Sequence, residues 1–168
     1  MRLNWTDDED HPGQFALWQA NCRRSLRSRQ GQAMLRELEA ALLALPEKRL
    51  VAHTLATETG DVCAVGALAK YQGHDLTAFD WEYESDAVGI QLGMPRLVAW
   101  SVVAQNDIEN DGRYEIAEGP SHNRWGSPGY SVFIATTPEE RYERMLLWVQ
   151  EQLRAPDMAI EDARTQTD

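Results

Sequence analysis

Regularly spaced leucines give the strongest structural signal in the chain. They recur at i, i+3, i+7 and i+10, the spacing that aligns side chains on one face of an α-helix: Leu35, Leu38, Leu42 and Leu45. Pro46 follows the last leucine, and a proline at that position ends a helix. The pattern predicts an amphipathic helix over residues 32–45 whose leucine face lies in the core.

Other stretches predict helices with broader or weaker apolar faces. The apolar residues of 14–27 have a loose helical spacing. The polar run Ser28–Gly31 that follows should interrupt the helix or bend the chain. Residues 62–72 are rich in small residues, with Asp61 as the expected N-cap. Residues 95–105 are apolar around most of the circumference, which predicts a largely buried central helix.

The last predicted helix has a strong start signal. Thr137 and Glu140 fit a capping box, in which each side chain accepts from the other residue's backbone N–H. Pro138 suits the first helical position, where its missing N–H is harmless. The apolar spacing continues to Arg154, and we expect Pro156 to end the helix.

Residues 106–135 differ from the rest, because they contain many glycines and prolines and have no helical period. Within them, the segments Arg113–Ala117 and Tyr130–Ala135 are rich in residues that favour strands. We expect these segments to pair as a small antiparallel hairpin with a long tip.

The predicted fold class is mainly α, a single compact helical domain with a small β-hairpin inserted before the C-terminal helix. An acidic N-terminal arm covers residues 1–14, and Asp7–Asp10 make it self-repelling. The helical domain covers 15–155, with 108–135 as the insertion. A polar tail covers 156–168.

Length and composition are those of one soluble globular domain. The chain has 168 residues, 43% of them hydrophobic and 26% charged, which excludes collagen-like and fully disordered classes. Cys22 and Cys63 are too few for a disulfide scaffold. The sequence has no apolar leader and no apolar run of about 20 residues. We expect a cytoplasmic protein, in the host cytoplasm if it is viral, with no membrane partner.

Charge is distributed unevenly along the chain. The net charge is −11, and the overall electrostatic field of such a protein repels nucleic acid. Residues 21–36 nevertheless contain five arginines and no acid, so this segment carries +5 and the remainder −16. The five are Arg23, Arg24, Arg27, Arg29 and Arg36.

Arginine side chains favour bidentate contacts with carboxylates or phosphates. Three interpretations of the arginine segment stay open. The arginines pair internally with the acidic arm or acidic loops, they bind an acidic patch on a partner protein or second subunit, or they contact a nucleic-acid backbone. Dispersed acids elsewhere are interpreted as a solvated surface rather than a mimic of nucleic acid.

Aromatic residues in predicted loops are further candidates for partner contacts. We expect Phe79 and Trp81 to fold back into the core, whereas Trp125 and Tyr130 are candidates for contact with a partner. The candidate partner-binding residues are therefore the five arginines together with Trp125 and Tyr130.

Cys63 is the one candidate nucleophile, because it lies at a predicted helix start, where the helix dipole lowers a thiol pKa. A cysteine-dependent enzyme would also need a histidine base, for which His53, His74 and His122 are the candidates. The residues around Cys63 lack the signature that such enzymes usually carry. We favour a buried small side chain at this position.

No metal or cofactor motif is present. The histidines are isolated, and neither paired cysteines nor a phosphate-binding glycine loop occurs. A run starting at Asp107 partly fits a calcium loop, with Gly112 at the sixth position and Glu118 at the twelfth. We interpret the run as a solvated acidic turn, and we assign no catalytic residue, metal or cofactor.

Four fragments share their order with a known family. They are RQGQAMLRELEAALLALPEKRLVA, GDVCAVGALAK, LVAWSVVAQND and TPEERYERMLLWVQEQ. Together they resemble a family of small uncharacterised proteins encoded in phages and prophages of proteobacteria. The family pattern has a Gly-Gln helix ending Leu-Pro-Glu-Lys-Arg, a Cys-Ala-x-Gly-Ala core helix, an Asn-Asp helix end and a Thr-Pro-Glu-x-Arg final helix.

The resemblance covers most of residues 15–153 and departs at 108–135, where the family has a short link. It implies a mainly helical fold and a phage or prophage gene, and it carries over no catalytic residue. Our leading hypothesis is a non-enzymatic accessory protein that binds a host or phage protein, with a defence system such as CRISPR interference as one candidate target. The alternatives are the Cys63 enzyme and a nucleic-acid binder acting through residues 23–36.

Overall fold

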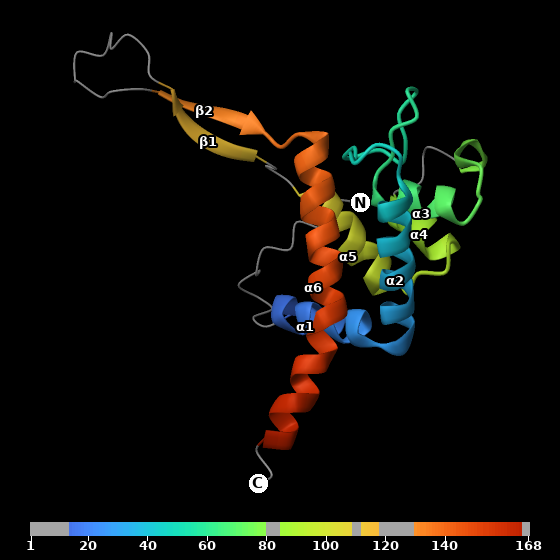
Figure 1. Cartoon of the computed structure of the whole chain (residues 1–168), viewed down its shortest axis with the longest axis vertical. Helices are drawn as coiled ribbons and strands as arrows, with labels where there is room; N and C mark the ends of the chain where they lie inside the picture. The colour runs from blue at the N-terminus through green and yellow to red at the C-terminus, as the bar shows by residue number, and fades with distance from the viewer. Residues whose placement is uncertain (1–13, 80–84, 109–111, 118–129, 166–168) are drawn as a thin grey trace.

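Helix α2 (Arg29–Ala44) and helix α6 (Pro138–Thr165) pack side by side along the long axis of the molecule (Figure 1). Helix α1 (Gln14–Arg27) crosses both, and α5 (Arg96–Asn106) packs against α1, α3 (Ala64–Tyr71) and α6. The computed structural model describes residues 14–79, 85–108, 112–117 and 130–165. The remaining elements are η1 (Leu76–Ala78), α4 (Ser85–Gln91), β1 (Gly112–Ala117) and β2 (Tyr130–Ala135). The mainly α architecture confirms the predicted fold class.

The predicted apolar faces form the core. Leu35, Leu38 and Leu42 on α2 are fully buried, and so are Met145 and Val149 on α6. All of them belong to one hydrophobic cluster, which α3 and α5 complete. Most residues of α3 are buried because small side chains let neighbouring backbone approach closely. A Cβ on Gly66, for example, would lie 2.3 Å from the Leu55 carbonyl oxygen.

The N-terminal boundary of α3 corrects the sequence prediction. Asp61 is not the N-cap, because residues 61–63 are not helical, Val62 forms a β-bridge with Ala56, and the backbone of Cys63 is extended. Cys63 holds the cap position instead, and its Sγ accepts from the Gly66 N–H at 3.4 Å. A sulfur cap is hard to anticipate, because cysteine is not among the residues that favour that position.

The start of α6 confirms the predicted capping box. The Thr137 N–H donates to Glu140 Oε2 at 2.8 Å, and the Glu140 N–H donates to Thr137 Oγ1 at 3.2 Å. Pro138 is the first helical residue, as predicted.

The predicted end of the last helix is wrong, since α6 continues past Pro156 to Thr165. A proline inside a helix leaves the carbonyl four residues earlier without its usual N–H donor. That carbonyl belongs to Gln152, and Gln32 Nε2 donates to it at 3.1 Å. A side chain from α2 thus satisfies the acceptor that the proline leaves open.

Strands β1 and β2 form the antiparallel hairpin that the sequence predicts. Gly112 pairs with Ala135 at the base, and Ala117 pairs with Tyr130 at the distal end. The hairpin projects away from the helical body (Figure 1).

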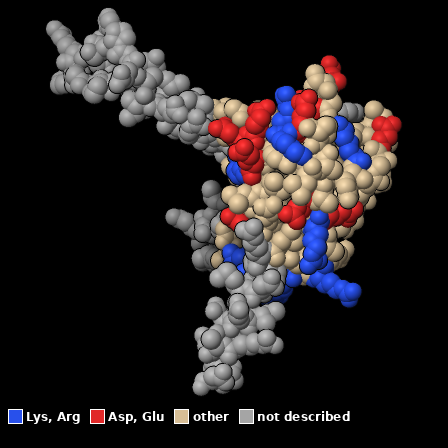
Figure 2. All heavy atoms as spheres, viewed as in Figure 1, with Lys and Arg blue, Asp and Glu red and all other residues tan. Residues whose placement is uncertain are grey.

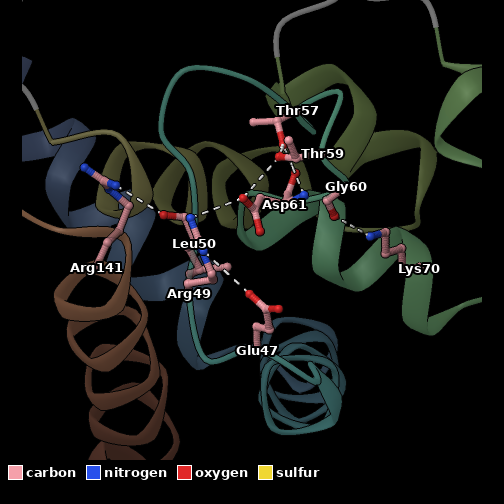
Figure 3. Close-up of polar contacts among 9 residues, drawn as sticks. All are labelled: Glu47, Arg49, Leu50, Thr57, Thr59, Gly60, Asp61, Lys70 and Arg141. Atoms are coloured by element: carbon pink, nitrogen blue, oxygen red, sulfur yellow. Dashed lines mark hydrogen bonds and ion pairs between the residues drawn. The ribbon is translucent and has the colours of Figure 1, made fainter.

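Residues 45–63 are irregular and are held by polar contacts from both sides (Figure 3). The Leu50 N–H donates to the Pro138 carbonyl at 2.9 Å, and Arg141 donates to the Leu50 carbonyl at 3.2 Å. Arg49 lies between Glu47 and Asp61, with its nearest contact 3.3 Å from Asp61 Oδ2. These contacts fix the segment that leads from α2 into α3.

No helix in the described part of the chain is both long and apolar enough to cross a membrane.

Candidate functional site

The junction of α1 and α2 is a tight corner in which a single residue, Ser28, separates the two helices. Ser28 Oγ accepts from the Gly31 N–H at 3.0 Å and caps α2. It also donates to the Ser25 carbonyl at 2.7 Å. The predicted break at Ser28–Gly31 is therefore confined to Ser28, and α2 starts earlier than the leucine pattern indicates.

Gly31 and Gln32 lock this corner. A Cβ on Gly31 would lie 2.1 Å from the Ser25 carbonyl oxygen, so no larger residue fits without moving backbone. Gln32 is buried, and its Nε2 donates to the Leu26 carbonyl at 2.8 Å as well as to Gln152. The corner is consequently tied to α6 and holds its outward side chains on a rigid support.

The inward side of α1 is anchored to the body. Cys22 and Leu26 are buried, and Trp18 stacks edge-to-face on Trp100 of α5 with ring centroids 4.4 Å apart. Burial raises the pKa of the Cys22 thiol, and a hydrogen bond with Ser101 partly offsets this increase. The outward side of α1 carries exposed polar residues together with Leu17.

All five arginines of the acid-free segment point outward, and we call them together the arginine surface: Arg23, Arg24, Arg27, Arg29 and Arg36. Each is exposed, which the sequence could not establish. Figure 2 shows basic side chains extending from the junction of α1 and α2 and from the middle of α2.

Within the described residues, no arginine of this surface forms an ion pair with an acid. The two nearest acids along α2 are engaged with amides instead. Glu37 accepts from Gln72 Nε2 at 3.0 Å, and Glu39 accepts from Gln150 Nε2 at 3.1 Å. The acidic arm that was one candidate for internal pairing lies outside the described residues.

Two exposed leucines share helix faces with these arginines, and the sequence interpretation missed them. Leu17 is 63% exposed and lies seven residues before Arg24, so both occupy one face of α1. Leu43 is 52% exposed and lies seven residues after Arg36 on α2. The i, i+7 spacing was visible in the sequence, but only the structure separates these leucines from the core ones.

Of the two aromatic candidates for partner contact, only Tyr130 lies among the described residues, and it is not part of the arginine surface. Trp125 lies outside the described residues, as does Trp81. Tyr130 is on β2, in the hairpin that projects from the opposite end of the molecule (Figure 1). Phe79 packs against the core, as predicted, and its ring lies edge-on to His74.

Cys63 has the environment of a structural residue. It is 3% exposed, and burial raises its thiol pKa to about 11. Asp107 lies close enough to raise that pKa further, the opposite of what a nucleophile needs. The hydrogen bonds of the Cys63 thiol involve Gly66, Val65 and Ser85, none of which is a base.

We therefore expect Cys63 to react slowly in the folded protein. In a Cys22→Ser variant, labelling by iodoacetamide should be at least about 100-fold slower than in urea, because the thiol is protonated and buried. The measurement is the mass of the protein against time in both solvents. Rapid labelling of the folded variant would restore the hypothesis of a cysteine-dependent enzyme.

Asn106 and Asp107 form a polar clamp at the end of α5. Asn106 is 2% exposed; its Nδ2 donates to the Val51 carbonyl at 2.9 Å, and its Oδ1 accepts from the Ala64 N–H at 3.1 Å. Asp107 Oδ1 accepts from the His53 N–H at 3.0 Å, which holds His53 at a positive φ of 58°.

The acidic run that follows Asp107 is described only in part. Glu118 lies outside the described residues. Among those described, no group of three or more potential ligands is arranged to hold a metal ion.

No family model matches the chain, and no curated protein or solved structure is detectably similar to it. The resemblance to phage and prophage proteins therefore stays a prediction.

Proposed function

We propose that this protein is a non-enzymatic binding protein that captures an acidic surface of a partner protein through its arginine surface. The observation that carries the proposal is the set of five exposed arginines with no acidic partner in the described residues. An exposed guanidinium group holds its N–H donors in a fixed planar fork, and this fork matches the two oxygens of a carboxylate. Several such groups on one rigid corner form a preorganised binding site for an acidic surface.

Rigidity of the corner supports a binding role. Binding is weakened when side chains and backbone must be ordered at the moment of association. The Ser28 cap, the close approach at Gly31 and the buried Gln32 contacts order this corner in advance. The arginines then lose only their own side-chain freedom on binding.

A protein partner is favoured over nucleic acid by two observations. Leu17 and Leu43 are exposed beside the arginines, and apolar contacts next to arginines are typical of protein interfaces. The rest of the chain carries −16, which would repel the dense negative charge of a nucleic acid. A carboxylate surface of limited extent meets less of this repulsion.

The biological context of the proposal comes from the resemblance described above. A phage or prophage accessory protein that occludes a host or phage protein is consistent with the burial and raised pKa of Cys63, the candidate nucleophile of the alternative hypothesis. A host defence complex such as CRISPR interference is one target of that kind.

Charge reversal tests the proposal directly. The variant Arg24→Glu/Arg27→Glu should lower partner capture about 100-fold, because two favourable charge contacts become repulsive. The matched control Lys70→Glu/Arg96→Glu has the same net charge and also changes exposed residues, with the loss of one Lys70 contact to the Gly60 carbonyl. Tagged proteins are used as baits in nuclease-treated proteobacterial lysate, and bound proteins are quantified by mass spectrometry.

Circular dichroism melts establish that both variants stay folded. Capture that falls only in the Arg24/Arg27 variant supports the proposal. Equal capture by the two variants contradicts it, and so does recovery of nucleic acid in place of protein when nuclease is omitted.

A further inference from the structure

The outward face of α2 is a continuous stripe of unusual composition. Buried residues of α2 cluster on one side of the helix, and the opposite side is directed to solvent. This opposite side consists of Arg29, Ala33, Arg36, Ala40 and Leu43, and we call it the α2 stripe. Ala40 is partly buried and the other four are exposed.

The spacing along the α2 stripe is regular. Arg29, Arg36 and Leu43 follow each other at seven-residue intervals, which places them about 10.5 Å apart along the helix axis. Ala33 and Ala40 occupy the intervening turns and leave the backbone between the larger side chains accessible. The stripe therefore repeats with the period that helices use to pack on one another.

The stripe also differs from an ordinary solvated helix face. Such faces usually combine acids and bases that support each other at i, i+4. Here no acid lies on the stripe, and the acids at its borders, Glu37 and Glu39, are hydrogen-bonded to Gln72 and Gln150. Leu43 meanwhile exposes 52% of its surface at the end of the stripe.

We propose that the α2 stripe docks an acidic amphipathic helix of the partner protein. This inference rests on the proposed function. It specifies the secondary structure of the partner's contact segment and the surface of this protein on which that segment docks. Carboxylates seven residues apart on one helix would face Arg29 and Arg36, and an apolar residue in the same register would cover Leu43. A straight stripe with a seven-residue period fits a helix better than a loop or a sheet edge.

Charge argues against a second copy of this chain as the occupant. In a parallel pairing of two α2 helices, each arginine of the stripe would face its own copy. In an antiparallel pairing centred on the stripe, Arg36 would face Arg36 of the second copy. Like charges at such short distance are destabilising, so the complementary charge must come from another protein.

Synthetic helical peptides of about three heptads are the probe. One has glutamates seven residues apart and leucines in the turns between on a single face, whereas its control has the same composition with the glutamates distributed around the helix. Fluorescence anisotropy with the intact protein should give at least about tenfold tighter binding of the first peptide. Equal binding of the two peptides would overturn the inference.

Two matched pairs of variants locate the binding. Leu43→Gln should weaken binding of the first peptide about tenfold, whereas Leu147→Gln changes a leucine on α6 of similar exposure, 54%, and should leave it unchanged. Ala33→Tyr should block the stripe, whereas Gln30→Tyr adds the same ring at an exposed position outside it.

The outcomes separate this inference from the proposed function. If Arg24→Glu/Arg27→Glu abolishes partner capture but the α2 variants bind the peptide normally, the docking inference is wrong and the proposed function stands. A Leu43-dependent dimer in light scattering would assign the stripe to a second copy and overturn the acidic-helix occupant.

Discussion

Replacement of Gly31 with alanine is expected to lower the free energy of unfolding by about 3 kcal/mol. The added Cβ would lie 2.1 Å from the Ser25 carbonyl oxygen and 2.9 Å from that of Leu26. Both atoms belong to backbone, so the end of α1 must move away from the start of α2. The same movement would disturb the Ser28 cap and the Gln32 contact to Leu26.

Urea unfolding monitored by circular dichroism measures this loss, and the matched control is Gln30→Ala. Gln30 is exposed on the same helical turn, and alanine has the highest helix propensity, so the control should be neutral or slightly stabilising. An unchanged stability of Gly31→Ala would mean that the corner is not a close-packed unit. The partner capture of a folded Gly31→Ala protein should also fall, because its arginines lose their fixed support.

The second large effect is expected at Asn106. Its replacement with alanine should lower the free energy of unfolding by about 3 kcal/mol, which corresponds to a fall in Tm of roughly 6 to 12 °C for a protein of this size. The Val51 carbonyl and the Ala64 N–H lose their side-chain partner at a buried site. The irregular segment between α2 and α3 then loses one of its links to α5.

Differential scanning calorimetry measures the shift, with Gln105→Ala as the control on the same helix. Gln105 is only half-buried, and its described hydrogen bond uses the backbone carbonyl, which alanine retains. Asn106→Asp should be as damaging as alanine, because a carboxylate cannot donate to the Val51 carbonyl and faces Asp107. A Tm of Asn106→Ala equal to that of Gln105→Ala would show that the clamp contributes nothing.

Local sequence signals predicted much of this fold. The leucine spacing of α2 depends only on residues within one helix, as does the capping box of Thr137 and Glu140. The hairpin segments were recognisable because strand-forming residues lie within a region that has no helical period. In each case the deciding interactions are close in sequence.

The errors arose where residues outside the predicted helix decide where that helix begins or ends. Asp61 resembles an N-cap, but the bridge between Ala56 and Val62 keeps the chain extended there and moves the cap to Cys63. Pro156 resembles a helix end, but Gln32 supplies the missing donor from a different helix. No window of sequence around Pro156 contains Gln32, and the pairing of Ala56 with Val62 precedes the helix and leaves no mark on its apolar spacing.

The candidate site was predictable only in composition. An acid-free segment with five arginines was visible in the sequence, but the absence of ion pairs in the described residues was not. The exposure of Leu17 and Leu43 depends on how α1 and α2 rotate against the core. Tyr130 stays a separate candidate for partner contact, because the hairpin that carries it projects away from the helical body and from the corner between α1 and α2 (Figure 1).

The contact between Gln32 and Gln152 joins residues 120 positions apart. During synthesis, α1 and α2 leave the ribosome long before α6 exists, and the leucine face of α2 then has no partner from α6. Such apolar surface on a nascent chain is a target for chaperones. The corner that carries the arginines gains its contact with Gln152 only when α6 packs against it, so we expect the proposed partner capture to require a chain in which α6 has already been synthesised.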